Sequence, residues 1–172
     1  MTPAEILKHI RNIPDFPKQG IMFKDITTAL KEPEVFQSII DNMYEQIKGL
    51  DIDYIAAIES RGYLFGAPLA CKMGKGLVLI RKSGKLPAEV VRQEYSLEYG
   101  TDALEMHKDA VEKGKKVLLV DDLLATGGTV RAAVGLVEQV GAEAVGALFL
   151  LELQQLSSAA NLPIPVYSLL RC

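Results

Sequence analysis

The sequence predicts an α/β fold, with a mostly parallel central sheet flanked by helices. Short runs rich in Val, Ile and Leu alternate with stretches whose apolar residues recur every three or four positions, as expected when helices connect parallel strands. The chain of 172 residues matches the usual size of one domain, and 49% apolar with 24% charged residues is an ordinary globular composition. We therefore expect a single domain over residues 1–172. The runs of strand length are 52–58, 77–80, 116–120, 144–151 and 166–170.

The charge balance and the cysteines limit the partners and the location. Nineteen Lys and Arg against 22 Asp and Glu give a net charge of −3, which argues against the basic face that nucleic-acid binding requires. Cys71 and Cys172 have no metal-ligand spacing, so we expect two reduced thiols. The charged N-terminus lacks a signal-peptide core, and the uncharged apolar stretch 144–151 is too short to span a bilayer. We expect a cytoplasmic protein without a nucleic-acid or membrane partner.

The first 30 residues form a small appendage, or hood, that precedes the sheet-forming core (31–172). Residues 2–5 make a capping box with Pro3 at the first helical position, so a short helix begins there. Prolines at 14 and 17 and Gly20 then predict an irregular segment over 13–30. A longer helix starts at Pro33, because its apolar residues recur at spacings of three and four until Gly49 ends it.

The remaining chain alternates strand, turn and helix. The run 52–58 is a buried strand, and 64–73 is a helix with Pro68 near its start. Ligands of parallel sheets lie beyond the carboxyl ends of the strands, so the residues after each apolar run are the candidates for binding.

The strongest candidate is the segment 117–129, in which a buried strand leads to Asp121 and Asp122 and then to a small-residue turn that opens a helix near Thr129. Residues 126–129 can direct backbone N–H groups at an anion, and the helix N-terminus adds partial positive charge. Carboxylates accept hydrogen bonds from sugar hydroxyls and attract Mg²⁺. A sugar phosphate with a divalent ion is the predicted ligand; the alternative is a tight turn capped by Thr and Asp side chains.

The segment 117–129 resembles the phosphoribosyl pyrophosphate (PRPP) signature of the type I phosphoribosyltransferases. Four other segments resemble the adenine phosphoribosyltransferase branch of that family: F-P-K-Q-G-I-M-F-K-D-I at 16–26, E-S-R-G at 59–62, L-I-R-K at 79–82 with G-K-L-P at 84–87, and Y-S-L-E-Y-G at 95–100. The resemblance implies the type I phosphoribosyltransferase fold with a flexible hairpin loop. It also implies that PRPP, carried with Mg²⁺, is a substrate.

The resemblance assigns two groups of residues to PRPP. Ala125, Thr126, Gly127, Gly128 and Thr129 would hold the 5′-phosphate, while Asp121 and Asp122 would hold the ribose hydroxyls and Mg²⁺ through water and PRPP. A strained cis peptide is expected at Ser60–Arg61, and Gly62 is expected to adopt an unusual backbone. There are two alternatives to pyrophosphate binding. Glu59 and Arg61 would form a surface ion pair, and Arg81 to Lys85 would form a solvated basic loop. The residues implied to bind pyrophosphate are Glu59, Ser60, Arg61, Arg81, Lys82 and Lys85.

The polar stretch 86–106 has the alternation of a hairpin, and the resemblance implies that it closes over PRPP and excludes water. Within it, Glu98 would assist proton handling at the attacking ring nitrogen of adenine, and Arg61 is the other implied catalytic residue. The alternatives are an ordinary edge ribbon and a surface glutamate.

Base recognition is implied for Met22, Phe23 and Lys24. Phe23 would stack on the base, and backbone groups of Met22 and Phe23 would distinguish a 6-amino from a 6-oxo purine. Lys24 stands where members of the family often carry Arg, and it offers a point charge instead of a planar fork. The alternative for Phe23 is packing within the appendage. His9 and His107 have no partner spacing and receive no role.

The predicted function is that of a pentosyltransferase of purine salvage, which forms AMP and pyrophosphate from adenine and PRPP with Mg²⁺. A homodimer is implied by the family resemblance only, as is a contribution to pyrophosphate binding across its interface. Two alternatives remain: a phosphoribosyltransferase for another purine base, and a non-catalytic PRPP-sensing regulator.

Overall fold

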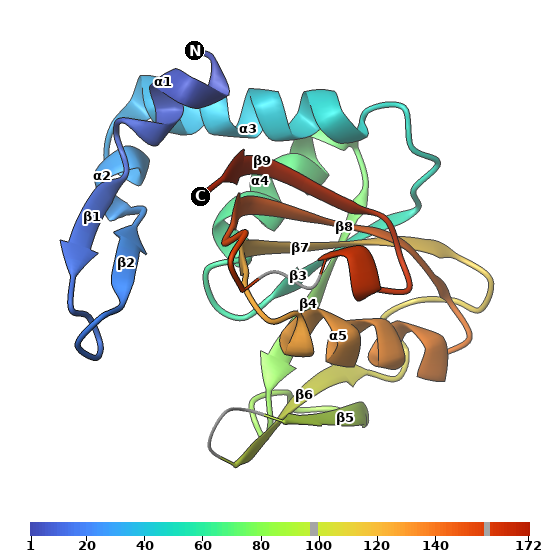
Figure 1. Cartoon of the computed structure of the whole chain (residues 1–172). Helices are drawn as coiled ribbons and strands as arrows, with labels where there is room; N and C mark the ends of the chain where they lie inside the picture. Colours follow the sequence, from blue (N-terminus) through green and yellow to red (C-terminus); the bar gives the residue numbers. More distant parts are fainter. Residues whose placement is uncertain (97–99, 157–158) are drawn as a thin grey trace. The chain divides into compact units, whose positions relative to one another are not determined.

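A seven-stranded mixed sheet in the order β5-β6-β4-β3-β7-β8-β9 forms the centre of the computed structural model (Figure 1). The structure describes residues 1–96, 100–156 and 159–172. Five neighbouring strands run parallel: β4 (Gly76–Lys82), β3 (Tyr54–Ile58), β7 (Lys116–Leu124), β8 (Glu143–Glu152) and β9 (Val166–Arg171). The mostly parallel sheet predicted from the apolar runs is therefore confirmed; four of the five runs lie within one of these strands, and the run 52–58 begins two residues before β3.

Two helices cover opposite faces of this sheet. Successive strand residues face opposite sides, so Ala56 and Ile58 join the buried cluster around α5 (Gly128–Gln139). Ala57 faces the other way, toward α4 (Tyr63–Met73), where a Cβ at Gly66 would lie 2.5 Å from the Ala57 Cβ. The flanking helices of the predicted α/β fold are thus confirmed.

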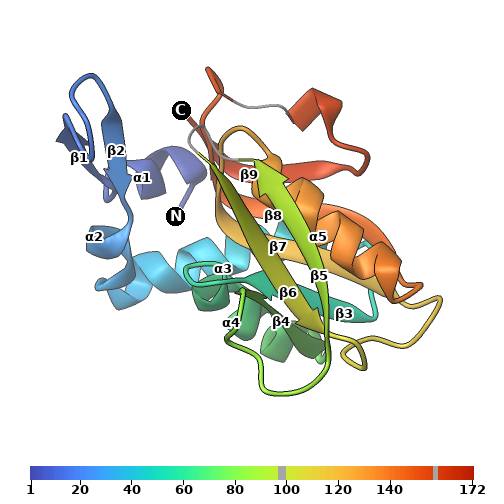
Figure 2. The same ribbon diagram turned by 90° about the horizontal axis from the view of Figure 1, so that it is seen from below.

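An antiparallel hairpin adds the last two strands at one edge of the sheet. It consists of β5 (Val90–Ser96) and β6 (Thr101–His107), and β6 pairs with the end of β4 through Arg81 and Lys82. Figure 2 shows this hairpin beside α5. The hairpin predicted over 86–106 is confirmed for its described residues; the tip, residues 97–99, lies outside them.

The chain divides into two compact units, residues 1–46 and 47–172. The first contains α1 (Pro3–Leu7), β1 (Arg11–Pro14), β2 (Met22–Asp25), α2 (Thr27–Leu30) and most of α3 (Pro33–Ile47). The predicted capping box is present, since Thr2 accepts from the Glu5 N–H and the Glu5 carboxylate accepts from the Thr2 N–H at 2.7 Å. The long helix from Pro33 is also confirmed.

The irregular segment predicted over 13–30 is wrong in part. Residues 11–14 and 22–25 pair as a two-stranded antiparallel sheet, and residues 27–30 form a short helix. Each strand has only four residues and one contains Pro14, so no periodic pattern could reveal them. Arg11 and Asp25 are cross-strand partners, and the Arg11 Nε donates to Asp25 Oδ2 at 3.1 Å.

Within the described residues, no helix is long and apolar enough to cross a membrane. Cys71 and Cys172 are free thiols, as predicted from their spacing. A short 3₁₀ helix, η1 (Ala159–Asn161), precedes the edge strand β9.

Candidate active site

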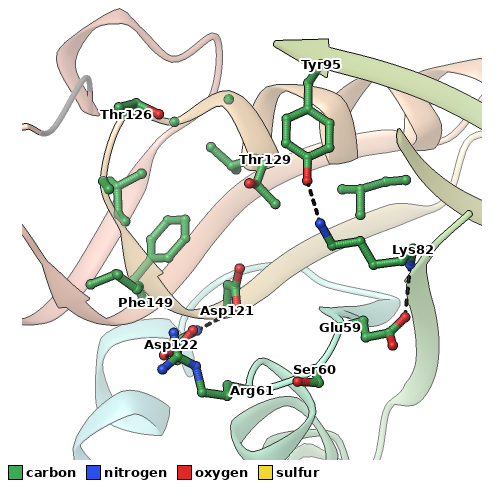
Figure 3. Close-up of a pocket in the computed structure, with 17 residues that line it drawn as sticks. Glu59, Ser60, Arg61, Lys82, Tyr95, Asp121, Asp122, Thr126, Thr129 and Phe149 are labelled. Atoms are coloured by element: carbon green, nitrogen blue, oxygen red, sulfur yellow. Dashed lines mark hydrogen bonds and ion pairs between the residues drawn. The ribbon is translucent and has the colours of Figure 1, made fainter. Parts of the chain in front are cut away.

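A cavity lies at the carboxyl ends of β3 and β7, where the strand order reverses. From β3 the chain continues to β4 on one side, and β7 then occupies the other side of β3. Such a switch point leaves a crevice between the loops that leave the two strands, because they turn in opposite directions. The cavity has a volume of about 370 Å³ (Figure 3). Its lining consists of Glu59, Ser60, Arg61, Lys82, Tyr95, Leu104, residues 121–130 and Phe149.

One wall of the cavity is the loop of residues 125–129, which we call the phosphate loop. β7 extends to Leu124, four residues beyond the predicted strand, because it pairs with β8 up to Glu152. Gly127 has a φ of 82°, a left-handed conformation that favours glycine, and α5 begins at the next residue. The first N–H groups of a helix have no acceptor within it, so α5 offers donors to an anion here.

The helix start is not capped by a side chain. Gly127 is the N-cap residue and makes no side-chain cap hydrogen bond, which contradicts the alternative that the turn exists to be capped by Thr and Asp. The strand, small-residue turn and helix predicted for 117–129 are therefore confirmed as a backbone arrangement suited to an anion.

Two acidic residues stand at the end of β7 beside this loop. Asp122 is buried, and its Oδ2 lies 2.9 Å from the Arg61 Nε. The Asp122 N–H donates to Asp121 Oδ1 at 2.8 Å. Desolvation, and then the charge of Asp122, raise the pKa of Asp121 well above its usual value. Desolvation also raises the pKa of Asp122, against the opposing charge of Arg61. Negative charge on Asp121 is therefore costly until a further cation or hydroxyl donors approach, whereas Arg61 already offsets part of that cost at Asp122.

The opposite wall is organised by Glu59, at the end of β3. Its carboxylate accepts from the Arg81 Nε at 3.2 Å, from the Lys82 N–H at 2.9 Å and from the Lys85 Nζ. Burial would raise the pKa of Glu59, but the hydrogen bonds from Lys85, the Lys82 N–H and Arg81 lower it to about 2. Glu59 is therefore an anion that gathers the cations of residues 81–85, which we call the basic loop.

The alternative ion pair between Glu59 and Arg61 does not describe the observed contacts. Arg61 contacts Asp122, while Glu59 contacts Arg81 and Lys85. The Arg81 Nη1 also donates to the Lys85 carbonyl at 3.1 Å, which closes the basic loop upon itself. The loop is therefore held by specific contacts, in contrast to a freely solvated basic loop.

Two expectations about the loop after β3 are wrong. The cis peptide joins Glu59 to Ser60, one peptide bond before the predicted Ser60–Arg61. It directly follows the hydrogen bond that the Glu59 N–H donates to the Ile80 carbonyl of β4. Gly62 has a φ of −58°, which is ordinary helical backbone. The glycine is required by space, because a Cβ at Gly62 would lie 2.5 Å from the Ile58 carbonyl and 2.7 Å from the Val120 carbonyl.

The cavity thus gathers most of the residues predicted to bind PRPP. Arg81 and Lys85 lie behind Glu59 and are absent from the lining. Glu98 lies outside the described residues. The lining residues among the predicted set are Glu59, Ser60, Arg61, Lys82, Asp121, Asp122, Ala125, Thr126, Gly127, Gly128 and Thr129.

The residues predicted to read the base lie in the first unit, on β2. The Phe23 ring packs edge-to-face on Phe16, with centroids 5.1 Å apart and an interplanar angle of 72°. The Lys24 Nζ donates to Asn12 Oδ1 at 2.7 Å. Met22 and Phe16 are about half exposed. In this two-stranded sheet β2 pairs with β1 along one edge, and its other edge faces away from β1.

Sequence reasoning missed six residues that line the cavity, namely Tyr95, Leu104, Leu123, Leu124, Val130 and Phe149, of which two are aromatic. Tyr95 comes from β5, and it was noted only as part of a hairpin alternation. Phe149 comes from the continuous apolar run of β8, where no signal distinguishes a cavity wall from the core. His9 and His107, which received no role, lie outside the lining; His9 Nδ1 is 3.0 Å from Glu32 Oε2.

The donor set has limited capacity for a metal ion. Among the described residues there is no group of three or more His, Cys, Asp or Glu that could hold one. Mg²⁺ requires six oxygen ligands and keeps several waters, so Asp121 and Asp122 could supply only part of its shell. These carboxylates fit an ion whose other ligands are substrate oxygens and water.

Comparisons with known proteins agree on one family. The family model of the phosphoribosyl transferase domain matches residues 26–166. An adenine phosphoribosyltransferase of Geotalea daltonii is 51% identical over 168 residues, covering 97% of this chain and 98% of the relative. The structure of adenine phosphoribosyltransferase from Thermoanaerobacter pseudethanolicus superposes with a TM-score of 0.96 at 51% identity, over 99% of this chain and 100% of that chain.

A second solved structure includes bound molecules. The adenine phosphoribosyltransferase of Saccharomyces cerevisiae, solved with an imino-altritol bisphosphate and adenine, gives a TM-score of 0.92 at 40% identity, with 97% of both chains covered.

Proposed function

The chain belongs to the adenine phosphoribosyltransferase family, and from this membership we propose that its cavity converts adenine and PRPP into AMP and pyrophosphate. The observation that carries the proposal is the meeting, in one cavity, of a backbone anion site, two carboxylates and two cations, Arg61 and Lys82. These groups match the phosphate, the ribose hydroxyls and the diphosphate of PRPP in turn. The chain is accordingly a pentosyltransferase of purine salvage.

The reaction breaks the bond between ribose C1 and the diphosphate oxygen, and the electron pair leaves on pyrophosphate. The sugar then carries positive charge, and the cations at the cavity stabilise the departing anion. The ring nitrogen of adenine forms the new bond to C1 and loses its proton. We assign the phosphate loop to the 5′-phosphate, Asp121 and Asp122 to the ribose hydroxyls, and Arg61 to pyrophosphate.

Mg²⁺ bound to PRPP would neutralise part of the diphosphate charge. The high pKa of Asp121 supports this assignment, because a carboxylate in a desolvated position is stabilised by a cation. In our proposal the ion is delivered with the substrate and contacts Asp121 and Asp122 through water.

Recognition of adenine is assigned to the first unit. The support is the position of Met22 and Phe23 on β2, where backbone N–H and C=O groups can donate and accept, as the edge of a 6-amino purine requires. Phe23 presents a ring for stacking, and Lys24 is fixed by Asn12. We keep Glu98 as the group that assists proton loss, on the basis of its place in the segment 95–100 alone.

A homodimer and a cytoplasmic location complete the proposal. Leu64 of α4 and Leu77 and Leu79 of β4 are 41%, 40% and 42% exposed on the same face of the sheet, a surface suited to a second copy of the chain. Leu79→Lys should then shift sedimentation from dimer to monomer; a monomeric wild-type chain would contradict the dimer.

The free thiols of Cys71 and Cys172 support the proposed location in the reducing cytoplasm.

The function is tested by incubating the chain with PRPP, Mg²⁺ and one purine at a time and measuring nucleotide formation. We expect AMP from adenine, and much slower reaction with hypoxanthine or xanthine. A preference for a 6-oxo purine would show a transferase for another base, and no nucleotide from any purine would leave a PRPP-sensing regulator.

The carboxylate pair gives the matching variant. Asp121→Asn with Asp122→Asn should reduce turnover on the order of 1,000-fold, because the ribose and its charge lose their acceptors. A thermal melt checks that the fold is intact, and Asp51→Asn, which removes an exposed carboxylate paired with Lys116, is the control. Near-normal turnover in the double variant would refute the assignment.

A further inference from the structure

We propose that Asp102 is a positioning residue for this reaction, which acts by fixing the ammonium of Lys82 at the edge of the cavity together with Tyr95. The inference rests on the proposed function, in which Lys82 holds the diphosphate. It adds a residue that does not line the cavity and that no sequence pattern singled out.

The contacts form a closed triangle of side chains. The Lys82 Nζ donates to Asp102 Oδ2 in a short ion pair and to the Tyr95 hydroxyl at 3.1 Å. The Tyr95 hydroxyl donates to the same Asp102 Oδ2 at 3.2 Å. The second oxygen, Asp102 Oδ1, accepts from the Ala103 N–H at 2.8 Å, so the carboxylate itself is held in one orientation.

The sheet register brings these residues together from three strands. Tyr95 and Asp102 are direct cross-strand partners in the β5–β6 hairpin. Lys82 is paired with Leu104, two residues from Asp102 on β6, and residues two apart on a strand share a face. A long side chain can reach such a diagonal neighbour. The backbone of Lys82 is fixed separately, by its N–H bond to Glu59.

The arrangement points the charge at the cavity and keeps it there. Lys82 and Tyr95 line the cavity (Figure 3), whereas Asp102 is absent from the lining. An ammonium has three donors, and among the described residues two of them are used by Asp102 and Tyr95. The third remains for a phosphate oxygen. An anchored charge needs no reorganisation when negative charge develops on the leaving group, which is where preorganisation lowers a barrier.

The triangle also touches the phosphate loop. A Cβ at Gly128 would lie 3.6 Å from the Tyr95 ring and 3.5 Å from the Ser96 carbonyl, so the hairpin packs on the first residue of α5. Asp102 therefore fixes Lys82, which would hold the diphosphate, relative to the phosphate loop, which would hold the 5′-phosphate.

A double-mutant cycle tests the inference. Asp102→Asn keeps the shape but removes the charge that anchors Lys82, and we expect kcat to fall about tenfold while the KM for PRPP changes less than about threefold. In a Lys82→Met background the same substitution should change kcat by less than about twofold, because no ammonium is left to position. A merely structural role would lower activity by the same factor in both backgrounds.

Calorimetry of Mg-pyrophosphate binding provides a second measurement if Lys82→Met turns over too slowly. The effect of Asp102→Asn on the dissociation constant should differ between the two backgrounds by at least about threefold. Equal effects in both backgrounds overturn the inference, as does a kcat of Asp102→Asn within about twofold of the wild type.

The matched control is Glu89→Gln. Glu89 pairs with Lys108 beside the same hairpin at 3.1 Å, and its side chain is 83% exposed, so its loss should leave kcat unchanged. A wild-type chain that forms no AMP would overturn the proposed function and this inference with it. A wild-type chain that forms AMP but is insensitive to Asp102→Asn overturns the inference alone.

Discussion

The phosphate loop (residues 125–129) and the basic loop (residues 81–85) both stand at strand ends beside one cavity, yet they are built in opposite ways. The phosphate loop relies on backbone: Gly127 is left-handed and α5 starts directly after it, with no side-chain cap. The basic loop relies on side chains, whose cations are gathered by the partly buried carboxylate of Glu59. One loop therefore depends on conformation, and the other depends on charge balance.

The difference explains how a chain of net charge −3 can bind a strongly anionic substrate. Backbone donors carry no net charge and remain in place without a ligand. Cationic side chains repel one another unless a counter-charge holds them, and Glu59 provides it. The two loops should consequently respond to different substitutions.

Of the substitutions in these two loops, Glu59→Gln should have the largest effect. The glutamine retains one acceptor but loses the charge that holds Arg81 and Lys85, so the basic loop loses its geometry. We expect kcat/KM for PRPP to fall on the order of 100-fold. The conformation of the phosphate loop should not change. Steady-state kinetics with varied PRPP measures it.

Glu112→Gln is the control for this variant. Glu112 accepts from the Tyr54 hydroxyl at the amino end of β3, the end opposite to the cavity. Its activity should match the wild type. If Glu59→Gln also keeps wild-type kcat/KM, the basic loop does not depend on its carboxylate and the contrast between the loops fails.

A smaller effect is expected from Gly127→Ala. An L-residue in the left-handed region costs about 1–2 kcal/mol, so the loop should shift and the KM for PRPP should rise about tenfold. Thr126→Ala, which removes an exposed side chain from the same loop, should change KM less than about threefold because the backbone donors stay. Equal effects of the two substitutions would show that side chains, not backbone, make this site.

The smallest effect concerns stability in acid. The pKa of Glu59 is lowered to about 2, so its contribution to stability is present above the unfolded value near 4.5 and is lost as pH falls from there toward 2. Glu59→Gln should flatten this part of the Tm profile, by about 2–4 °C for each kcal/mol that the ion pairs supply. Thr126→Ala should leave the fall in Tm between about pH 4.5 and 2 unchanged. If both variants flatten this part of the Tm profile equally, Glu59 is not the cause of the fall.

Much of the fold could be predicted because its signals are local. The capping box of Thr2 and Glu5, the apolar strands and the turn 125–129 each depend on residues adjacent in sequence. β1 and β2 could not be predicted, since strands of four residues, one containing Pro14, carry no periodic signal. The extension of β7 to Leu124 depends on its pairing with β8, which the sequence does not display.

The candidate site shows the same limit. Asp121, Asp122 and the phosphate loop were identifiable because their chemistry is contiguous. Asp102 was not, because its partners Lys82 and Tyr95 come from other strands and meet it only through sheet register. The need for glycine at 62 arises from carbonyls of β3 and β7, whereas the sequence alone suggested an unusual backbone there.

The crowding at Gly62 has a consequence for mutational tolerance. A Cβ there would meet the carbonyl oxygens of Ile58 and Val120, backbone atoms of two strands that cannot give way separately. At Gly49, by contrast, an added Cβ would meet nothing within 4 Å. A library that randomises both positions should return glycine alone at 62 and many residue types at 49. Position 62 is thereby closed to inhibitor-resistance substitutions, so contacts made beside it offer a durable target for ligand design.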